Sequence, residues 1–191
     1  MKRKAPPKTL VLHGVYFIIA GIILMLFPLN YLDHMGGLYS DLAGFLLMAV
    51  GLVDLHLMNI GFSAAAGCAV LCALGSLACV IFHVPHLVEL LPTELYSAVL
   101  FFMCTSFKRL ALLVGDEHSA HHFISHMKLD IVAMVVEIAV HAAELPHWVG
   151  YIAFAFALYA EVNLMILMWR FRKTGSGKLC KEAENNTGCA A

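Results

Sequence analysis

The chain has 191 residues, of which 61% are hydrophobic and only 13% are charged, and its formal net charge at pH 7 is −1. The length alone would suit one soluble domain, but this composition excludes an ordinary soluble domain and is typical of multi-spanning membrane proteins. The net charge is uninformative as a total. What matters is where the twelve Lys and Arg residues lie along the chain.

Six apolar stretches are each long enough, at about 20 residues, to cross a bilayer as a helix. The segment between the fourth and the fifth, Leu110 to His122, is predicted to be a short amphipathic connector. We therefore predict an all-α integral membrane protein, a compact bundle of six transmembrane helices arranged as three hairpins. The predicted spans are Leu10–Leu29, Leu38–Ile60, Phe62–Phe82, about Leu87–Phe107, Phe123–Leu145 and Trp148–Phe171.

The basic residues predict the orientation of these spans. Six crossings from a cytoplasmic N-terminus place all twelve Lys and Arg on the cytoplasmic side, as the positive-inside rule requires. Residues 1–9 then form a basic cytoplasmic N-terminus and residues 10–171 the transmembrane domain. The Gly, Ser and Asn content of residues 172–191 predicts a disordered cytoplasmic tail. Both termini are expected in the cytoplasm, and the helices between them are expected to lie in a lipid bilayer.

The fifth predicted span carries an unusual set of ionisable side chains. At 100° per residue, five of them fall in an arc of about 60° on one helix face. An ionised side chain facing lipid at the centre of a bilayer costs roughly 2.5 to 3.5 kcal/mol, so this stripe should face protein, water or a bound ion. The residues of the stripe are His126, Asp130, Glu137, His141 and Glu144.

Two carboxylates of neighbouring spans are expected at the same depth. Asp130 lies sixteen residues before Pro146, and Glu161 lies fifteen after it. Two carboxylates that share a dry site cannot both ionise cheaply, so the pair would hold one proton between them. The alternative is a buried hydrogen-bonded pair that only fixes helix packing. The predicted proton or ion pathway consists of Asp54, His126, Asp130, Glu137 and Glu161.

Two clusters near the outer ends of spans three and five predict a metal site. Imidazole together with carboxylate suits Zn(II) or another divalent first-row metal. Interfacial histidines that contact only water or headgroups are the alternative. The candidate ligands are His83, His86 and Glu89 in the first cluster and His141, Glu144 and His147 in the second.

Haem is the second candidate cofactor. His83 or His86 on span three and His141 on span five resemble the paired histidines that six-helix membrane cytochromes of the b type place on alternating spans. The resemblance implies two axial imidazole ligands near the outer surface. A second pair would need a histidine inside span four, and the sequence has none there.

A further histidine cluster, His118, His121, His122 and His126, lies at the cytoplasmic end of span five. Its spacings resemble one histidine box of the membrane di-iron desaturases and hydroxylases. Such enzymes need several boxes on one membrane face, and the sequence holds no other full box. Three hypotheses remain for this cluster: it senses a metal, it collects protons, or it is a solvated loop.

Two glycines of the second span, Gly44 and Gly51, are seven residues apart and so share a helix face. Small residues on one face let two helices approach closely. The sequence therefore predicts a tight helix contact at this face.

The polar groups that recur along span five favour a small transporter or channel for protons or divalent cations. The alternative is a non-catalytic membrane subunit or assembly factor of a larger complex, in which the stripe meets a partner helix. A membrane-protein partner or a homo-oligomer is compatible with both, whereas no nucleic-acid partner is expected. An enzyme is not favoured, and a haem-binding membrane protein is a further alternative.

Overall fold

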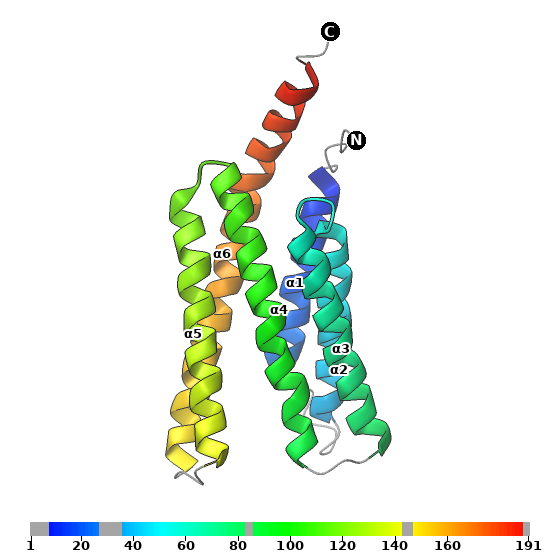
Figure 1. Ribbon diagram of the computed structural model, residues 1–191, viewed down its shortest axis with the longest axis vertical. Helices are drawn as coiled ribbons and strands as arrows, with labels where there is room; N and C mark the ends of the chain where they lie inside the picture. The colour runs from blue at the N-terminus through cyan, green and yellow to red at the C-terminus, as the bar shows by residue number, and fades with distance from the viewer. Residues whose placement is uncertain (1–7, 27–35, 83–85, 143–146, 189–191) are drawn as a thin grey trace.

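The computed structural model describes residues 8–26, 36–82, 86–142 and 147–188. Successive helices run in opposite directions, so that α1 begins and α6 ends at the same end of the molecule, the upper end in Figure 1. The predicted all-α bundle of six helices is confirmed. The helices are α1 (Lys8–Leu26), α2 (Gly36–Leu55), α3 (Ile60–Phe82), α4 (His86–Leu113), α5 (Glu117–Ala142) and α6 (His147–Gly188).

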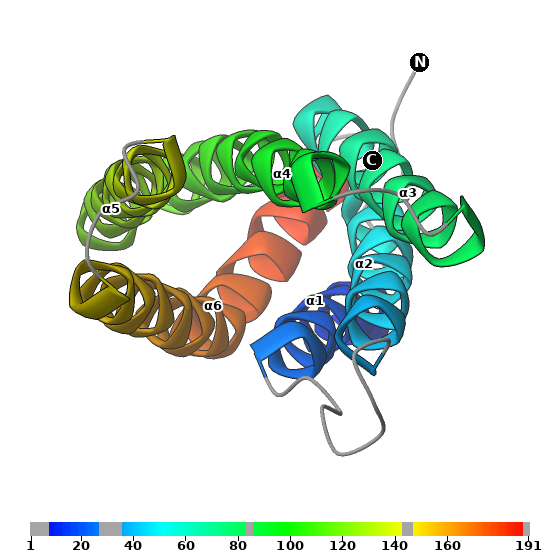
Figure 2. The same cartoon turned by 90° about the horizontal axis from the view of Figure 1, so that it is seen from below.

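The helices form a closed ring in the order of the sequence (Figure 2). Each helix packs against the next one along the chain, and α1 also packs against α6. Because α2 contacts α3 and α4 contacts α5, the three predicted hairpins are not separate units. The hydrophobic core takes side chains from all six helices.

The connection between α4 and α5 is much shorter than the predicted connector Leu110 to His122. Gly115 adopts a positive φ of 70°, which glycine tolerates without strain, and the chain reverses there. Asp116 then accepts hydrogen bonds from the backbone N–H of Ser119 at 3.0 Å and from its hydroxyl at 2.7 Å. This N-cap starts α5 early. The predicted connector is therefore wrong in length. Its three histidines, which were expected between helices, lie in α5.

Glycine determines the contact between α1 and α2. A methyl group placed on Gly14 would lie 2.8 Å from the carbonyl oxygen of Gly51, and one on Gly44 would lie 2.8 Å from that of Gly21. Real Cβ atoms essentially never come that close to another heavy atom. The predicted tight contact at Gly44 and Gly51 is confirmed, and the partner helix supplies its own two glycines.

Four buried phenylalanines join α3, α4, α5 and α6. The ring of Phe107 lies 5.0 Å from that of Phe62, 5.2 Å from that of Phe123 and 6.0 Å from that of Phe171, measured between centroids. All four side chains are almost completely buried. Stacked and edge-to-face pairs at these separations stabilise beyond the burial of their area. These four rings, the phenylalanine cluster, hold four helices together.

The seam between α1 and α6 contains a buried arginine. The guanidinium of Arg172 lies 3.8 Å from the centroid of the Trp169 ring and 4.4 Å from that of the Tyr16 ring. The two aromatic rings also meet edge to face at 5.5 Å. A guanidinium between two aromatic faces is a favourable cation–π arrangement, more so when water is excluded. This contact helps to close the ring of helices.

Two helices contain apolar stretches that are long enough to cross a membrane, judged by length and composition over the described residues. They are Ile60–Cys79 in α3 and Leu95–Leu113 in α4, and a shorter apolar stretch, Leu12–Leu26, lies in α1. Each of the six predicted spans coincides over most of its length with one helix, although α2 ends at Leu55 rather than at Ile60. That all six cross a membrane stays a prediction.

The backbone of α6 remains helical to Gly188 and projects beyond the bundle (Figure 1). Disorder was predicted for residues 172–191, and this prediction is not confirmed over residues 172–188. Six of the seven residues from 178 to 184 are Lys, Leu, Glu or Ala, which have high helix propensity.

The glycine contact gives a direct test. Replacement of Gly51 by alanine should lower the free energy of unfolding by about 1 to 3 kcal/mol, because the new methyl group meets backbone atoms that cannot rotate away. Gly67→Ala is the matched control, since nothing lies within 4 Å of a methyl group at that position. Thermal unfolding of both variants in detergent measures the difference, and equal stabilities would contradict the proposed contact.

Candidate functional site

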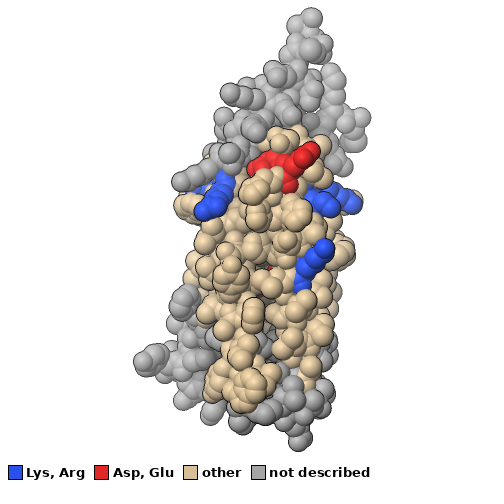
Figure 3. Space-filling view, turned by 90° about the vertical axis from the view of Figure 1, so that its left-hand side faces the viewer, with Lys and Arg blue, Asp and Glu red and all other residues tan. Residues whose placement is uncertain are grey.

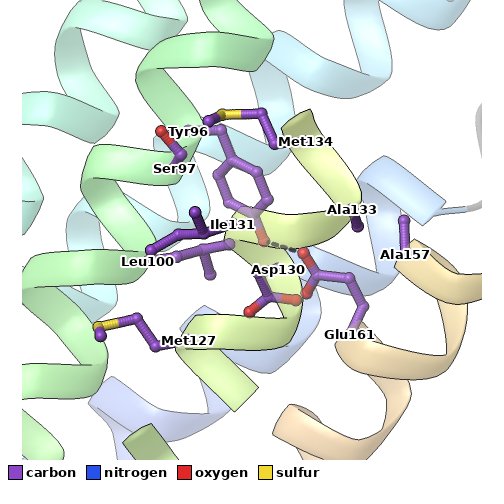
Figure 4. A pocket seen from close by; sticks show the side chains of 10 residues that line it. All are labelled: Tyr96, Ser97, Leu100, Met127, Asp130, Ile131, Ala133, Met134, Ala157 and Glu161. Atoms are coloured by element: carbon purple, nitrogen blue, oxygen red, sulfur yellow. Dashed lines mark hydrogen bonds between the residues drawn. The ribbon is translucent and has the colours of Figure 1, made fainter. Parts of the chain in front are cut away.

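A pocket lies between α4, α5 and α6 (Figure 4), and its empty volume, including the space open to solvent, is about 540 Å³. Polar groups come from all three helices, and the remaining lining is apolar. The polar lining residues are Tyr96, Ser97, Asp130 and Glu161, and the apolar ones are Leu100, Met127, Ile131, Ala133, Met134 and Ala157.

The register of the hairpin formed by α5 and α6 brings Asp130 and Glu161 together. Both line the pocket, and Figure 4 shows their carboxyl groups pointing toward one another. Their positions on either side of Pro146 predicted this meeting.

Tyr96 of α4 anchors one of the two carboxyl groups. Its hydroxyl donates a hydrogen bond of 2.7 Å to Oε1 of Glu161. The tyrosine ring meets the buried ring of Phe45, on α2, edge to face at 5.8 Å. Sequence reasoning missed Tyr96. A tyrosine inside an apolar span does need a hydrogen-bond partner, but that signal does not say which of several carboxylates provides it.

One further oxygen of each carboxyl group has no partner among the described residues. Oδ2 of Asp130 and Oε2 of Glu161 are buried and accept no hydrogen bond from the described residues. Glu161 is only 8% exposed. A buried polar atom left unsatisfied costs about 1 to 3 kcal/mol, and two negative charges in one apolar site also repel each other. Such a pair requires a proton or a cation.

A line of histidines on α5 leads to this pair. His118, His122, His126 and Asp130 follow one another at intervals of four residues and so share one face of the helix. The Nε2 atoms of His118 and His122 lie 3.1 Å apart, and the rings of His122 and His126 lie 6.4 Å apart between centroids.

Burial increases along the same line. His118 and His122 are exposed, whereas His126 is half-buried. Nδ1 of His126 is buried and has no hydrogen-bond partner among the described residues. We call these three side chains the histidine ladder. It leads from the surface at the upper end of α5 toward Asp130.

The remaining residues of the predicted pathway are not part of this constellation. Asp54 lies half-buried on α2 and does not line the pocket. The side chain of Glu137 falls outside the described residues. The participation of each predicted residue in a proton or ion pathway stays a prediction.

The predicted outer metal site falls on parts of the chain whose side chains are not described. The same holds for the histidines of the predicted haem pair, so both stay predictions. Among the described side chains, no group of three or more His, Cys, Asp and Glu residues can hold a metal ion. The candidate ligands concerned are His83, His86, Glu89, His141, Glu144 and His147.

In comparisons with known proteins, no family model, no curated protein and no solved structure matches the chain.

The hydrogen bond between Tyr96 and Glu161 can be measured with a double-mutant cycle of Tyr96→Phe, Glu161→Leu and the double variant. We expect a coupling free energy between about 0.5 and 1.5 kcal/mol if Glu161 is protonated, and between about 1.5 and 3 kcal/mol if it is ionised. Unfolding in detergent gives the four stabilities. Tyr159→Phe is the control, since Tyr159 is 62% exposed. Strictly additive effects would show that the two groups do not interact.

Proposed function

We propose that the protein is a small membrane transporter or channel that moves protons, with Asp130 and Glu161 as its central proton-binding pair. The observation that carries the proposal is the pair of buried carboxyl groups whose free oxygens have no donor among the described residues. A proton shared between them removes the repulsion and supplies the missing donor.

A proton suits this pair better than a divalent cation. Ca²⁺ takes six to eight oxygen ligands, and Mg²⁺ requires six in octahedral geometry. Zn²⁺ is held by three or four His, Cys or carboxylate groups. The pocket lining offers two carboxyl groups, a phenol and a serine hydroxyl. A single proton needs only the two carboxyl oxygens.

Exposed side chains support the proposal that all six helices cross the membrane. Each helix carries large apolar side chains on its outer surface, and a soluble monomer rarely exposes apolar area on so many elements. Lipid would cover these groups at no cost. One example from each helix, with its exposed fraction, is Ile23 (43%), Val53 (52%), Leu74 (55%), Phe101 (44%), Val132 (57%) and Ile166 (45%).

The basic side chains support the proposed orientation. On the face turned toward the viewer in Figure 3, Lys and Arg lie in the upper part of the molecule and at about mid-height, and none shows among the described residues of its lower part. The upper end is the one at which α1 begins and α6 ends (Figure 1). Under the positive-inside rule it would face the cytoplasm.

In the proposed mechanism the histidine ladder passes protons between the cytoplasmic surface and the pair. A neutral imidazole accepts a proton at one ring nitrogen and donates from the other. The contact of 3.1 Å between His118 and His122 suits direct transfer. The separation of 6.4 Å between the next two rings requires a bridging water or a rotation of one ring. His126 then delivers the proton to Asp130, one helical turn further on.

Below the pair, Glu137 would continue the route, because it lies seven residues, or two helical turns, beyond Asp130 on the same face.

The opposing proposal is a non-catalytic membrane subunit, in which the pair only fixes helix packing. Measurement of proton flux separates the two.

Asp130→Asn and Glu161→Gln should each reduce proton flux to the level of empty liposomes, because an amide keeps the volume but cannot release a proton. Their stability in detergent should be unchanged or higher, since a buried charge is removed. A pH-sensitive dye trapped in proteoliposomes measures the flux. Glu117→Gln, at an exposed site in the first turn of α5, is the matched control. Parental flux in both pocket variants would favour the subunit role.

The histidine ladder provides a second test. His122→Ala should slow proton flux, because it removes the middle imidazole of the line. His121→Ala should leave flux unchanged, since this neighbour is equally exposed but lies 100° away around the helix. The same dye assay compares the two variants. Equal effects would indicate that the histidines act only as surface groups.

A further inference from the structure

The pocket is larger and more apolar than a proton site needs. We propose that it binds an organic ammonium ion with an apolar body, which takes the place of the shared proton between Asp130 and Glu161. This inference rests on the proposed proton-binding role of the pair and names a substrate class for the same site.

The anionic end of the pocket suits an ammonium group. Oδ2 of Asp130 and Oε2 of Glu161 are buried acceptors without a donor from the described residues, while Tyr96 occupies only Oε1 of Glu161. An –NH₃⁺ group carries three donors and no acceptor. Hydrogen bonds from a cation to carboxylates are about twice as strong as neutral ones. One ammonium group can therefore satisfy both free oxygens and neutralise one charge.

The walls of the pocket suit an apolar body. Six of the ten lining residues are apolar, and they surround the carboxyl pair from three helices (Figure 4). Met127 and Met134 are among them, and methionine adapts its shape to irregular apolar partners. The empty volume of about 540 Å³, which includes space open to solvent, leaves room beside the carboxyl pair for more than a proton.

No cation of the protein occupies this place among the described residues, because neither Lys nor Arg lines the pocket. The two carboxyl groups, the phenol and the serine hydroxyl are fewer oxygen ligands than Ca²⁺ or Mg²⁺ takes, and they lack the imidazole or thiolate that usually helps to hold Zn²⁺. An organic ammonium ion uses both parts of the pocket, the carboxyl pair and the apolar wall.

Binding would exchange one cation for another. The singly protonated pair, one COOH and one COO⁻, takes up R–NH₃⁺ and becomes two carboxylates bound to R–NH₃⁺, and the shared proton leaves for solvent. Total charge is zero on both sides. The ammonium ion and the proton thus compete for the same oxygens, which is the requirement for exchange across a membrane.

The test uses the purified full chain in lipid nanodiscs and titrates 1-adamantylammonium chloride by calorimetry. We expect saturable binding of one ion, with release of about one proton, read from the difference between two buffers of unlike ionisation enthalpy. The neutral 1-adamantanol, which has the same cage, should not show saturable binding. Empty nanodiscs correct for partition of the probe into lipid.

Variants then locate the site. Asp130→Asn and Glu161→Gln should each weaken ammonium binding at least about tenfold, whereas Glu117→Gln should bind as the parent does. Ala157→Leu should also weaken binding, because it fills the pocket and leaves both carboxyl groups in place. If a variant fails to fold, the proposal is still tested by comparing the binding of the ammonium ion and of the alcohol to the parent protein.

The inference is overturned if the parent shows no saturable binding, if the alcohol binds equally well, or if the folded carboxyl variants bind as the parent does. Proton flux measured without the probe is a separate readout. Parental flux together with no ammonium binding rejects only the ammonium site. Ammonium binding without proton flux retains the site and rejects the proton pathway.

Discussion

The contact that the rest of the bundle depends on is the phenylalanine cluster around Phe107. It brings α3, α4, α5 and α6 to one point. From this point, Asp130 lies seven residues beyond Phe123 on α5, and Glu161 lies ten residues before Phe171 on α6. At 1.5 Å per residue these separations are about 10 and 15 Å, so the aromatic contact sets the register in which the two carboxyl groups meet. The histidine ladder runs past the cluster on α5.

The two sides of the ring are built differently, and the pocket lies on only one of them. Gly14, Gly21, Gly44 and Gly51 bring α1 and α2 to backbone contact, and core side chains lie directly against these glycines. Between α4, α5 and α6 the helices leave a pocket that is lined mostly by apolar side chains. α2 still reaches the site, because Phe45 supports Tyr96, which in turn holds Glu161.

Burying the two carboxyl groups costs folding free energy, and this cost is the reason to connect the pair with function. Replacing buried ionisable groups by well-packed apolar side chains is often neutral or stabilising, so packing alone does not require them. Asp130 and Glu161 have oxygens without partners in a pocket whose walls are mostly apolar. A pair of this kind is useful where a proton or a cation must bind and leave again, and it is costly elsewhere.

The sequence by itself determined the six helices, the glycine face of α2, and the meeting of Asp130 with Glu161, because helix length, helix periodicity and a short hairpin are local properties. It also contained the four-residue spacing of the histidine ladder. Only the tertiary structure decided that Tyr96 is the partner of Glu161, that Asp54 lies outside the pocket and that α1 closes on α6. These facts depend on the order and rotation of helices around the ring, which are set by side-chain packing between segments far apart in the chain.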